Sequence, residues 1–283
     1  MDWKEAKVLI EEIKRRTERK AYSLVIDKGR QPELIDSKFG GLPYWDMEKE
    51  YPVDSKGKKL MLLAQFNLER MFQEVEYDKL LPETGMLQFF IAMDEMYGMD
   101  FDEQDIQKDF RVVYHETVNE QVTKEQVKSL GIPACTDDDL EEYIPIWKEA
   151  ALKIVRKPVF MGEGDYRFDL VFREIQKEKF GKQHEAQSMY QLLDEEAYDR
   201  MVEELSNENH WLLGYPYFTQ TDPREYEERY QYYDTLLFQM DSDYGEDEDY
   251  ILWGDAGVAN FFINQKDLEK RDFSKVLYNW DCC

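Results

Sequence analysis

A pattern of four short segments occurs twice in the sequence, in the same order and at nearly constant spacing. The matched pairs are residues 41–45 (GLPYW) with 214–218 (GYPYF), 62–67 (LLAQFN) with 236–241 (LLFQMD), 85–91 (GMLQFFI) with 257–263 (GVANFFI), and 111–115 (RVVYH) with 275–279 (KVLYN). Such collinear matches are typical of an internal duplication, because chance similarities do not keep their order along a chain. We predict a first structural repeat over residues 1–135 and a second over residues 136–283, with a helical insertion near residues 183–208.

The predicted fold is α+β, with two mainly antiparallel β units and flanking helices packed as one body. Strands are expected where apolar runs are bounded by turn residues, at 21–26, 60–66, 86–93, 110–117, 235–240, 260–263 and 275–280. Helices are expected where apolar residues recur every three or four positions, at 2–20, from Thr136 to Lys157 and from Glu185 to Glu204. Because no stretch rich in Gly, Ser or Pro separates the halves, we expect them to pack together.

Composition places the chain among soluble intracellular proteins. Its 283 residues are 42% hydrophobic and 14% aromatic, which is enough to form a substantial core. The first sixteen residues are charged throughout, and no apolar run approaches the roughly 20 residues that span a bilayer. Three cysteines cannot form a disulfide framework. We therefore expect a cytoplasmic location.

The net charge is −26, from 36 basic and 62 acidic side chains. A field of this sign repels nucleic acid phosphates and anionic lipid headgroups, so neither nucleic acid nor a membrane is predicted as a partner. Two interpretations remain: the charge serves solubility alone, or it attracts a basic protein. The sequence gives no indication of the oligomeric state.

The bend at residues 40–45 presents two aromatic side chains. Gly40 and Gly41 permit backbone angles closed to other residues and Pro43 fixes its own φ, so Tyr44 and Trp45 should have a defined position. They form either a buried aromatic corner or an aromatic wall that faces a ligand.

Two similar units packed together often leave a cleft, and this is where we place a candidate ligand site. Its residues would be Tyr44, Trp45, Gln65, Gln239 and Asp241, with Gln65 facing Gln239. Buried amides need hydrogen-bond partners, which a ligand can supply. Alternatively, these amides bind the backbone of neighbouring turns within each repeat.

No motif for catalysis, metal binding or a cofactor is present. The histidines at positions 115, 184 and 210 are scattered, and none has a ligand spacing with a cysteine. The acidic loop at residues 241–249 lacks EF-hand spacing: counting from Asp241, Gly245 falls at position 5 instead of 6, and Leu252 occupies position 12 instead of a glutamate. The loop is either a solvated acidic hairpin loop or a calcium site of some other geometry. We assign no metal ligand and no cofactor, and we identify no catalytic residue.

Several longer motifs resemble those of the YwqG-like family of uncharacterised bacterial proteins. They are SKFGGLPYW (37–45), LLAQFNL (62–68), LPETGMLQFF (81–90), LLGYPYF (212–218), LLFQMDSD (236–243) and GVANFFINQKDL (257–268). The resemblance implies an α+β protein with two structural repeats from a bacterial cytoplasm, and it brings no activity and no catalytic residues. For some relatives it also implies a role as immunity proteins in toxin systems.

Two functional hypotheses follow. The first is a noncatalytic protein-binding module, such as an immunity-type inhibitor of a basic toxin, and the second is an enzyme or small-ligand-binding protein that uses the cleft between the repeats. A bend present in both halves is more easily explained by the fold than by one active site. We therefore expect function where the halves differ, at residues 185–204 and at the acidic loop 241–249.

Overall fold

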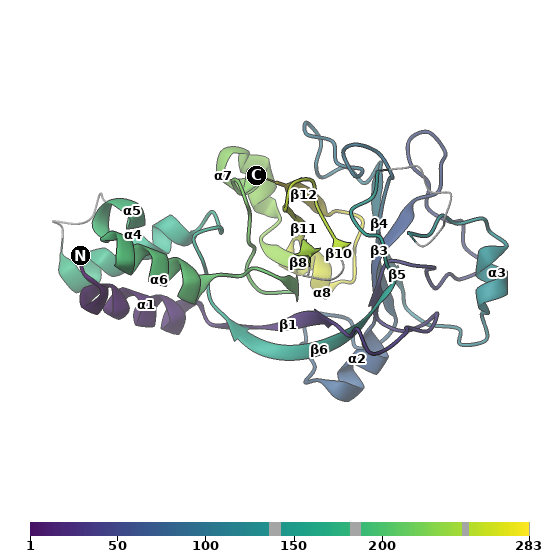
Figure 1. Ribbon diagram of the computed structural model, residues 1–283, viewed down its shortest axis with the longest axis horizontal. Coiled ribbons are helices and arrows are strands. Elements are labelled where there is room, and N and C mark those ends of the chain that lie inside the picture. The colour runs from purple at the N-terminus through teal and green to yellow at the C-terminus, as the bar shows by residue number, and fades with distance from the viewer. Residues whose placement is uncertain (136–142, 182–187, 245–248, 283) are drawn as a thin grey trace.

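The computed structural model describes residues 1–135, 143–181, 188–244 and 249–282. It combines helices with a large antiparallel sheet that nearly closes into a barrel. Figure 1 shows a group of helices at one end and the barrel at the other, joined by two long strands, β1 (Arg19–Ile26) and β6 (Ala150–Val159).

The chain begins with α1 (Trp3–Thr17), which confirms the predicted N-terminal helix. The Asp2 side chain accepts a hydrogen bond from the Glu5 amide, and the Glu5 side chain accepts one from the Asp2 amide, so this capping box satisfies two free N–H groups. One face is buried among apolar side chains, including Leu9 and Ile13. This face contacts α4 (Phe168–Phe180) and α6 (Glu195–Leu205).

Ten strands form the main sheet, in the order β12-β11-β8-β7-β1-β6-β2-β3-β4-β5, and every pairing is antiparallel. The other strands of this sheet are β2 (Lys38–Phe39), β3 (Met61–Asn67), β4 (Met86–Ile91), β5 (Phe110–His115), β7 (His210–Leu212), β8 (Thr235–Asp241), β11 (Val258–Ile263) and β12 (Leu277–Asp281). A separate ribbon pairs β9 (Asp243–Tyr244) with β10 (Asp249–Ile251). The remaining helices are α2 (Leu68–Glu74), α3 (Lys124–Lys128), α5 (Met189–Leu192), α7 (Pro223–Tyr226), α8 (Gln265–Glu269) and the 3₁₀ helix η2 (Glu228–Tyr232).

The two halves of the sequence exchange strands at the centre of the sheet. β1 pairs with β6 over eight residues, from Arg19 opposite Val159 to Ile26 opposite Leu152. On its other side β1 pairs with β7, whereas β6 pairs with β2. Each half therefore completes the sheet of the other, and residues 1–135 alone hold no partner for β1.

Aromatic rings fill the interior of the barrel. Phe66 and Phe89 from β3 and β4 contact Phe238 of β8, with ring centroids 5.4 and 4.7 Å apart. Phe110 of β5 and Tyr278 of β12 lie 5.1 Å apart, so the two outermost strands of the sheet also meet through their side chains. These contacts join the halves into one hydrophobic core.

The helix predicted from Thr136 to Lys157 is wrong. Residues 136–142 lie outside the described part, and residues 150–159 form β6 instead of a helical turn. The apolar side chains at Ala151 and Ile154 are three apart, which suggested a helix, but the segment is extended because β1 and β2 supply its hydrogen bonds. Pairing with distant strands therefore overrides the local pattern.

Two further expectations change in detail. The segment 185–204 lies partly outside the described residues, and its described part forms two helices, α5 and α6, with a break at Leu193 and Asp194.

The fourth matched pair of sequence segments also shifts, because Gln88 lies opposite Val113 whereas Asn260 lies opposite Asn279. Val113 thus corresponds to Asn279, two residues beyond the position that the sequence match suggests, and a shift of two keeps each side chain on the same face of the sheet.

Candidate functional site: an acidic groove

The first bend forms a buried aromatic corner. Tyr44 is 1% exposed and Trp45 is 2% exposed. The Trp45 ring nitrogen donates to the Lys49 carbonyl, and the Tyr44 hydroxyl accepts from the Asn119 amide. Of the two interpretations of this bend, the structure agrees with the buried aromatic corner and not with an aromatic wall that faces a ligand.

The polar network under this bend extends to a histidine. His115 Nε2 lies 3.0 Å from Gln88 Oε1, and the Gln88 amide donates to the Tyr44 carbonyl at 2.7 Å. Burial, together with the nearby Lys49 ammonium, lowers the pKa of His115 to about 4. The ring is therefore neutral at pH 7 and acts as a structural group.

Gln65 and Gln239 each tie a bend to the backbone beneath it. The Gln65 side-chain oxygen accepts from the Tyr44 amide at 2.9 Å, and the Gln239 oxygen accepts from the Tyr217 amide at 2.8 Å. The Gln65 nitrogen donates to the carbonyls of residues 34 and 36, and the Gln239 nitrogen donates to those of residues 207 and 209. These bonds match the alternative in which the amides hold turns in place.

The structure does not bring the two glutamines together. Phe66 and Phe238 meet inside the barrel, and successive side chains of a strand point to opposite faces. Gln65 and Gln239 therefore lie on the outer face. Of the five candidate ligand residues, Asp241 is the one that lines a pocket described below, where it is half-buried.

Three adjoining pockets form a groove between the helices and the second bend, and we call it the acidic groove. The Glu163 pocket has a volume of about 260 Å³ and lies at the start of α4. The central pocket, about 320 Å³, lies between α6 and residues 216–220, and the Asp243 pocket, about 410 Å³, lies beside β7 and β8. Shared lining residues connect them: Glu163 and Phe168 at one junction, Glu208 and Tyr217 at the other.

The described lining of the groove contains eight carboxyl groups and no lysine or arginine. Asp165, Asp169 and Asp222 each have an arginine partner outside the lining. Among the described residues, no lysine or arginine forms an ion pair with the other five carboxyl groups, those of Glu163, Glu208, Glu225, Asp241 and Asp243, although Lys28 acts on Asp243 from a longer distance. The middle of the groove is its least polar part, because Met201 and Leu205 line it together with polar residues such as Gln220.

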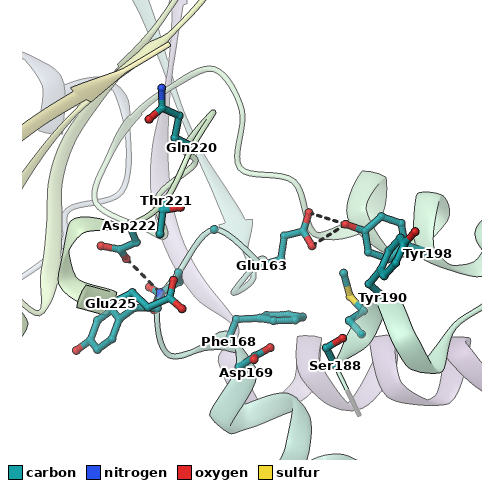
Figure 2. Close-up of a pocket in the computed structure, with 14 residues that line it drawn as sticks. Glu163, Phe168, Asp169, Ser188, Tyr190, Tyr198, Gln220, Thr221, Asp222 and Glu225 are labelled. Atoms are coloured by element: carbon teal, nitrogen blue, oxygen red, sulfur yellow. Dashed lines mark hydrogen bonds between the residues drawn. The ribbon is translucent and has the colours of Figure 1, made fainter. Parts of the chain in front are cut away.

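A close backbone approach positions Glu163. A side-chain carbon at Gly162 would lie 2.4 Å from the Leu205 carbonyl oxygen, so only glycine lets this segment pass the end of α6. The Glu163 carboxyl accepts from the Tyr198 hydroxyl, 3.2 Å from its nearer oxygen (Figure 2). Withdrawal from water raises the pKa of Glu163, against the effect of this hydrogen bond.

A buried ionic network forms the floor of the Glu163 pocket. Asp165 accepts two hydrogen bonds from Arg167, at 2.6 and 2.7 Å, and Asp222 accepts from Arg224, which is fully buried. Burial opposes the charge on Asp165, but Arg167 and Arg224 outweigh it and lower the pKa of this carboxyl group. The network is charge-compensated and structural.

Asp241 and Asp243 flank a buried histidine in the third pocket. His210 Nδ1 accepts from the Asp241 amide at 3.0 Å, which leaves Nε2 to carry the proton, 3.8 Å from Asp243. The pKa of Asp243 is lowered by the His210 side chain, whereas burial raises the pKa of Asp241. Among the described residues no group of three His, Cys, Asp or Glu side chains could hold a metal ion.

The second bend differs from the first in what covers it. Tyr217 follows Pro216 as Tyr44 follows Pro43, and its amide is held by the equivalent glutamine. Tyr217, however, is only half-buried and lines both the central and the Asp243 pockets. The Asn119 segment contacts Tyr44 of the first bend, whereas Tyr217 of the second bend lines the wall of the groove.

Sequence reasoning missed the residues of the Glu163 pocket. Gly162, Glu163 and Gly164 match no complete motif and were not among the candidate site residues. Two glycines around one glutamate do indicate tight packing of the backbone, which is the signal that could have located it. Phe168 and Tyr198 gave no such signal, since they reach the pocket from separate helices.

Comparison with known families adds one finding. Residues 37–282 match the model of a domain of unknown function, DUF1963. The chain belongs to this family. The DUF1963 match begins after α1 and β1, although β1 lies near the middle of the sheet. No curated protein matches the chain in sequence. Among the described helices, none combines the length and apolar character needed to cross a bilayer.

Proposed function

We propose that the acidic groove binds a segment of a basic protein, and that the role is noncatalytic, as in an immunity-type inhibitor. The observation that carries the proposal is the lining of the groove: eight carboxyl groups, no lysine or arginine among the described residues, and apolar side chains such as Met201 and Leu205 in the central pocket. A matching segment would place an apolar side chain in the central pocket and cationic side chains toward both ends.

Charge complementarity supports a polypeptide with basic residues over other polymers. The net charge of −26 attracts such a segment from a distance, and the unpaired carboxyl groups then provide local partners. The same charges repel phosphate groups of nucleic acids and lipids. The proposal includes a cytoplasmic location, which we expect from the composition. It also includes membership of the YwqG-like family, which the sequence motifs resemble.

We also infer that the two halves arose by duplication and that the groove developed where they diverged. Equivalent amides support this: Gln88 donates to the Tyr44 carbonyl, and Asn260 donates to the Tyr217 carbonyl. The strand order supports it too, because the sheet is symmetric about its centre, which lies between β1 and β6. In this order β1 corresponds to β6, β2 to β7, β3 to β8, β4 to β11 and β5 to β12. The groove uses α4 to α6, which lie between β6 and β7 and have no counterpart in the short connection between β1 and β2.

A binding measurement with matched charge variants tests the groove. The probe is a fluorescent peptide with a central leucine flanked on both sides by lysines and arginines, followed by anisotropy at low and high salt. The groove variant combines Glu163→Gln, Glu208→Gln and Glu225→Gln. The control combines Glu11→Gln, Glu50→Gln and Glu83→Gln, which are exposed and do not line the groove. Both variants have a net charge of −26 + 3 = −23.

We expect the groove variant to lose about tenfold in affinity and the control to change less than about twofold. Binding of the natural chain should weaken as salt rises, because exposed charges are screened. Equal loss in both variants would mean that the peptide responds to net charge alone, and absence of binding at low salt would refute a basic segment as the ligand.

A further inference from the structure

The Glu163 pocket combines aromatic rings with a carboxyl group that has no cationic partner among the described residues. Tyr166, Phe168, Tyr190 and Tyr198 all line it. The rings of Tyr190 and Tyr198 meet edge to face, with centroids 5.6 Å apart, and in Figure 2 they lie at the side of the pocket toward which Glu163 points. Aromatic faces and carboxylates together attract organic cations.

The neighbouring carboxyl groups show what Glu163 lacks. Asp165 has Arg167 at 2.6 Å, and Asp222 has Arg224 at 2.7 Å. Glu163 is instead bonded to the neutral hydroxyl of Tyr198. A phenol can satisfy one lone pair of a carboxylate but cannot balance its charge, so the site remains suited to a cation from outside.

The protein contains its own example of the arrangement. The Arg224 guanidinium lies 3.9 Å from the centroid of Phe262 and 4.9 Å from that of Tyr166, while it donates to both oxygens of Asp222. A planar guanidinium can stack on rings and bind a carboxylate in a bidentate manner at the same time. A lysine ammonium can only act as a point charge.

We propose that the Glu163 pocket is a specific subsite for one arginine side chain of the bound segment. This rests on the proposed function of the groove and deepens it. The guanidinium binds the Glu163 carboxylate and lies against the rings of Phe168 and Tyr198. The pocket has a volume of about 260 Å³, which is enough to admit a whole arginine side chain. The adjoining central pocket shares Glu163 and Phe168, so an apolar residue next to the arginine reaches it.

Small amides of single amino acids test the subsite without the rest of a partner. N-acetyl-arginine amide, its lysine analogue and its citrulline analogue are titrated into isotopically labelled protein, and amide chemical shifts are followed by NMR. Citrulline has nearly the shape of arginine but no charge. We expect shifts centred on Gly164, Phe168 and Tyr198, about tenfold weaker binding of citrulline, and a measurably weaker response to lysine.

The variant Glu163→Gln should lose arginine binding to the same extent, whereas Glu11→Gln should keep it. Both substitutions keep the size of the side chain, so unchanged melting temperatures confirm that the fold is intact. Equal binding of arginine and citrulline, or shifts located elsewhere, would overturn the subsite. The two proposals fail separately: peptide binding that is insensitive to arginine-to-citrulline replacement removes only the subsite, whereas arginine-amide binding at Glu163 without peptide binding removes only the groove function.

Discussion

Single amide side chains hold the two bends of this protein in position. Gln65 and Gln239 are both fully buried, and each satisfies one backbone N–H and two backbone carbonyls. The sequence indicated that these residues are equivalent, and it left open whether they bind a ligand or the backbone. That choice depended on segments far along the chain, such as Asn119 over the first bend, which no local pattern reveals.

Replacing either amide by an isosteric apolar residue should therefore destabilise the fold. Gln65→Leu leaves three buried backbone groups without a partner, and we expect a loss of about 3 kcal/mol in the free energy of unfolding, with a similar loss for Gln239→Leu. Urea unfolding followed by circular dichroism measures it. The exposed Gln121→Leu serves as the control and should stay within about 0.5 kcal/mol of the natural chain. Unchanged stability of Gln65→Leu would contradict the structural role.

At the scale of elements, the relation between α6 and the segment before α4 shapes the acidic groove. Gly162 passes the Leu205 carbonyl at the end of α6, and the next residue is Glu163.

The apolar strands could be predicted from the sequence, because each is recognised by its own alternation or its own apolar run. β6 could not, since its extended form comes from β1 and β2. The groove could not be predicted either, because it lies between elements that are distant in sequence.

The variant Gly162→Ala tests this close approach. Its added carbon would lie 2.4 Å from a backbone oxygen, so α6 must move, and we expect a loss of about 2 kcal/mol in stability together with weaker peptide binding. Gly29→Ala is the control, because the nearest atom there lies at an ordinary 3.4 Å. Thermal unfolding and the anisotropy assay measure the two effects. If Gly162→Ala binds and unfolds like the natural chain, the packing does not define the groove.

For the whole molecule, the exchange of β1 and β6 ties the halves together more firmly than their shared core alone would. The sequence predicted two units packed as one body, with a boundary between residues 135 and 136. The structure shows a single sheet in which the central strand of each half belongs to the hydrogen-bonded ladder of the other. Such an exchange leaves no trace in hydrophobic periodicity, because either arrangement buries the same side chains.

Fragments 1–135 and 136–283 should therefore be unfolded separately and form a native-like complex when mixed. Each alone exposes a long strand without its partners, and mixing restores the pairing of β1 with β6 and β7. Circular dichroism and analytical ultracentrifugation of the separate and mixed fragments measure this. Ser23→Pro in the first fragment removes a donor in the middle of β1 and should prevent assembly. A fragment that unfolds cooperatively by itself would refute the interdependence.

The central position of β1 also has a consequence for synthesis on the ribosome. Residues 19–26 leave the exit tunnel early, but their partners at 152–159 and 210–212 are made only after more than a hundred further residues. The nascent N-terminal half therefore cannot close its sheet until most of the polypeptide has been translated. Folding of this kind is slow and depends on bringing distant segments together, so the emerging chain should be a substrate for chaperones that shield unpaired strands.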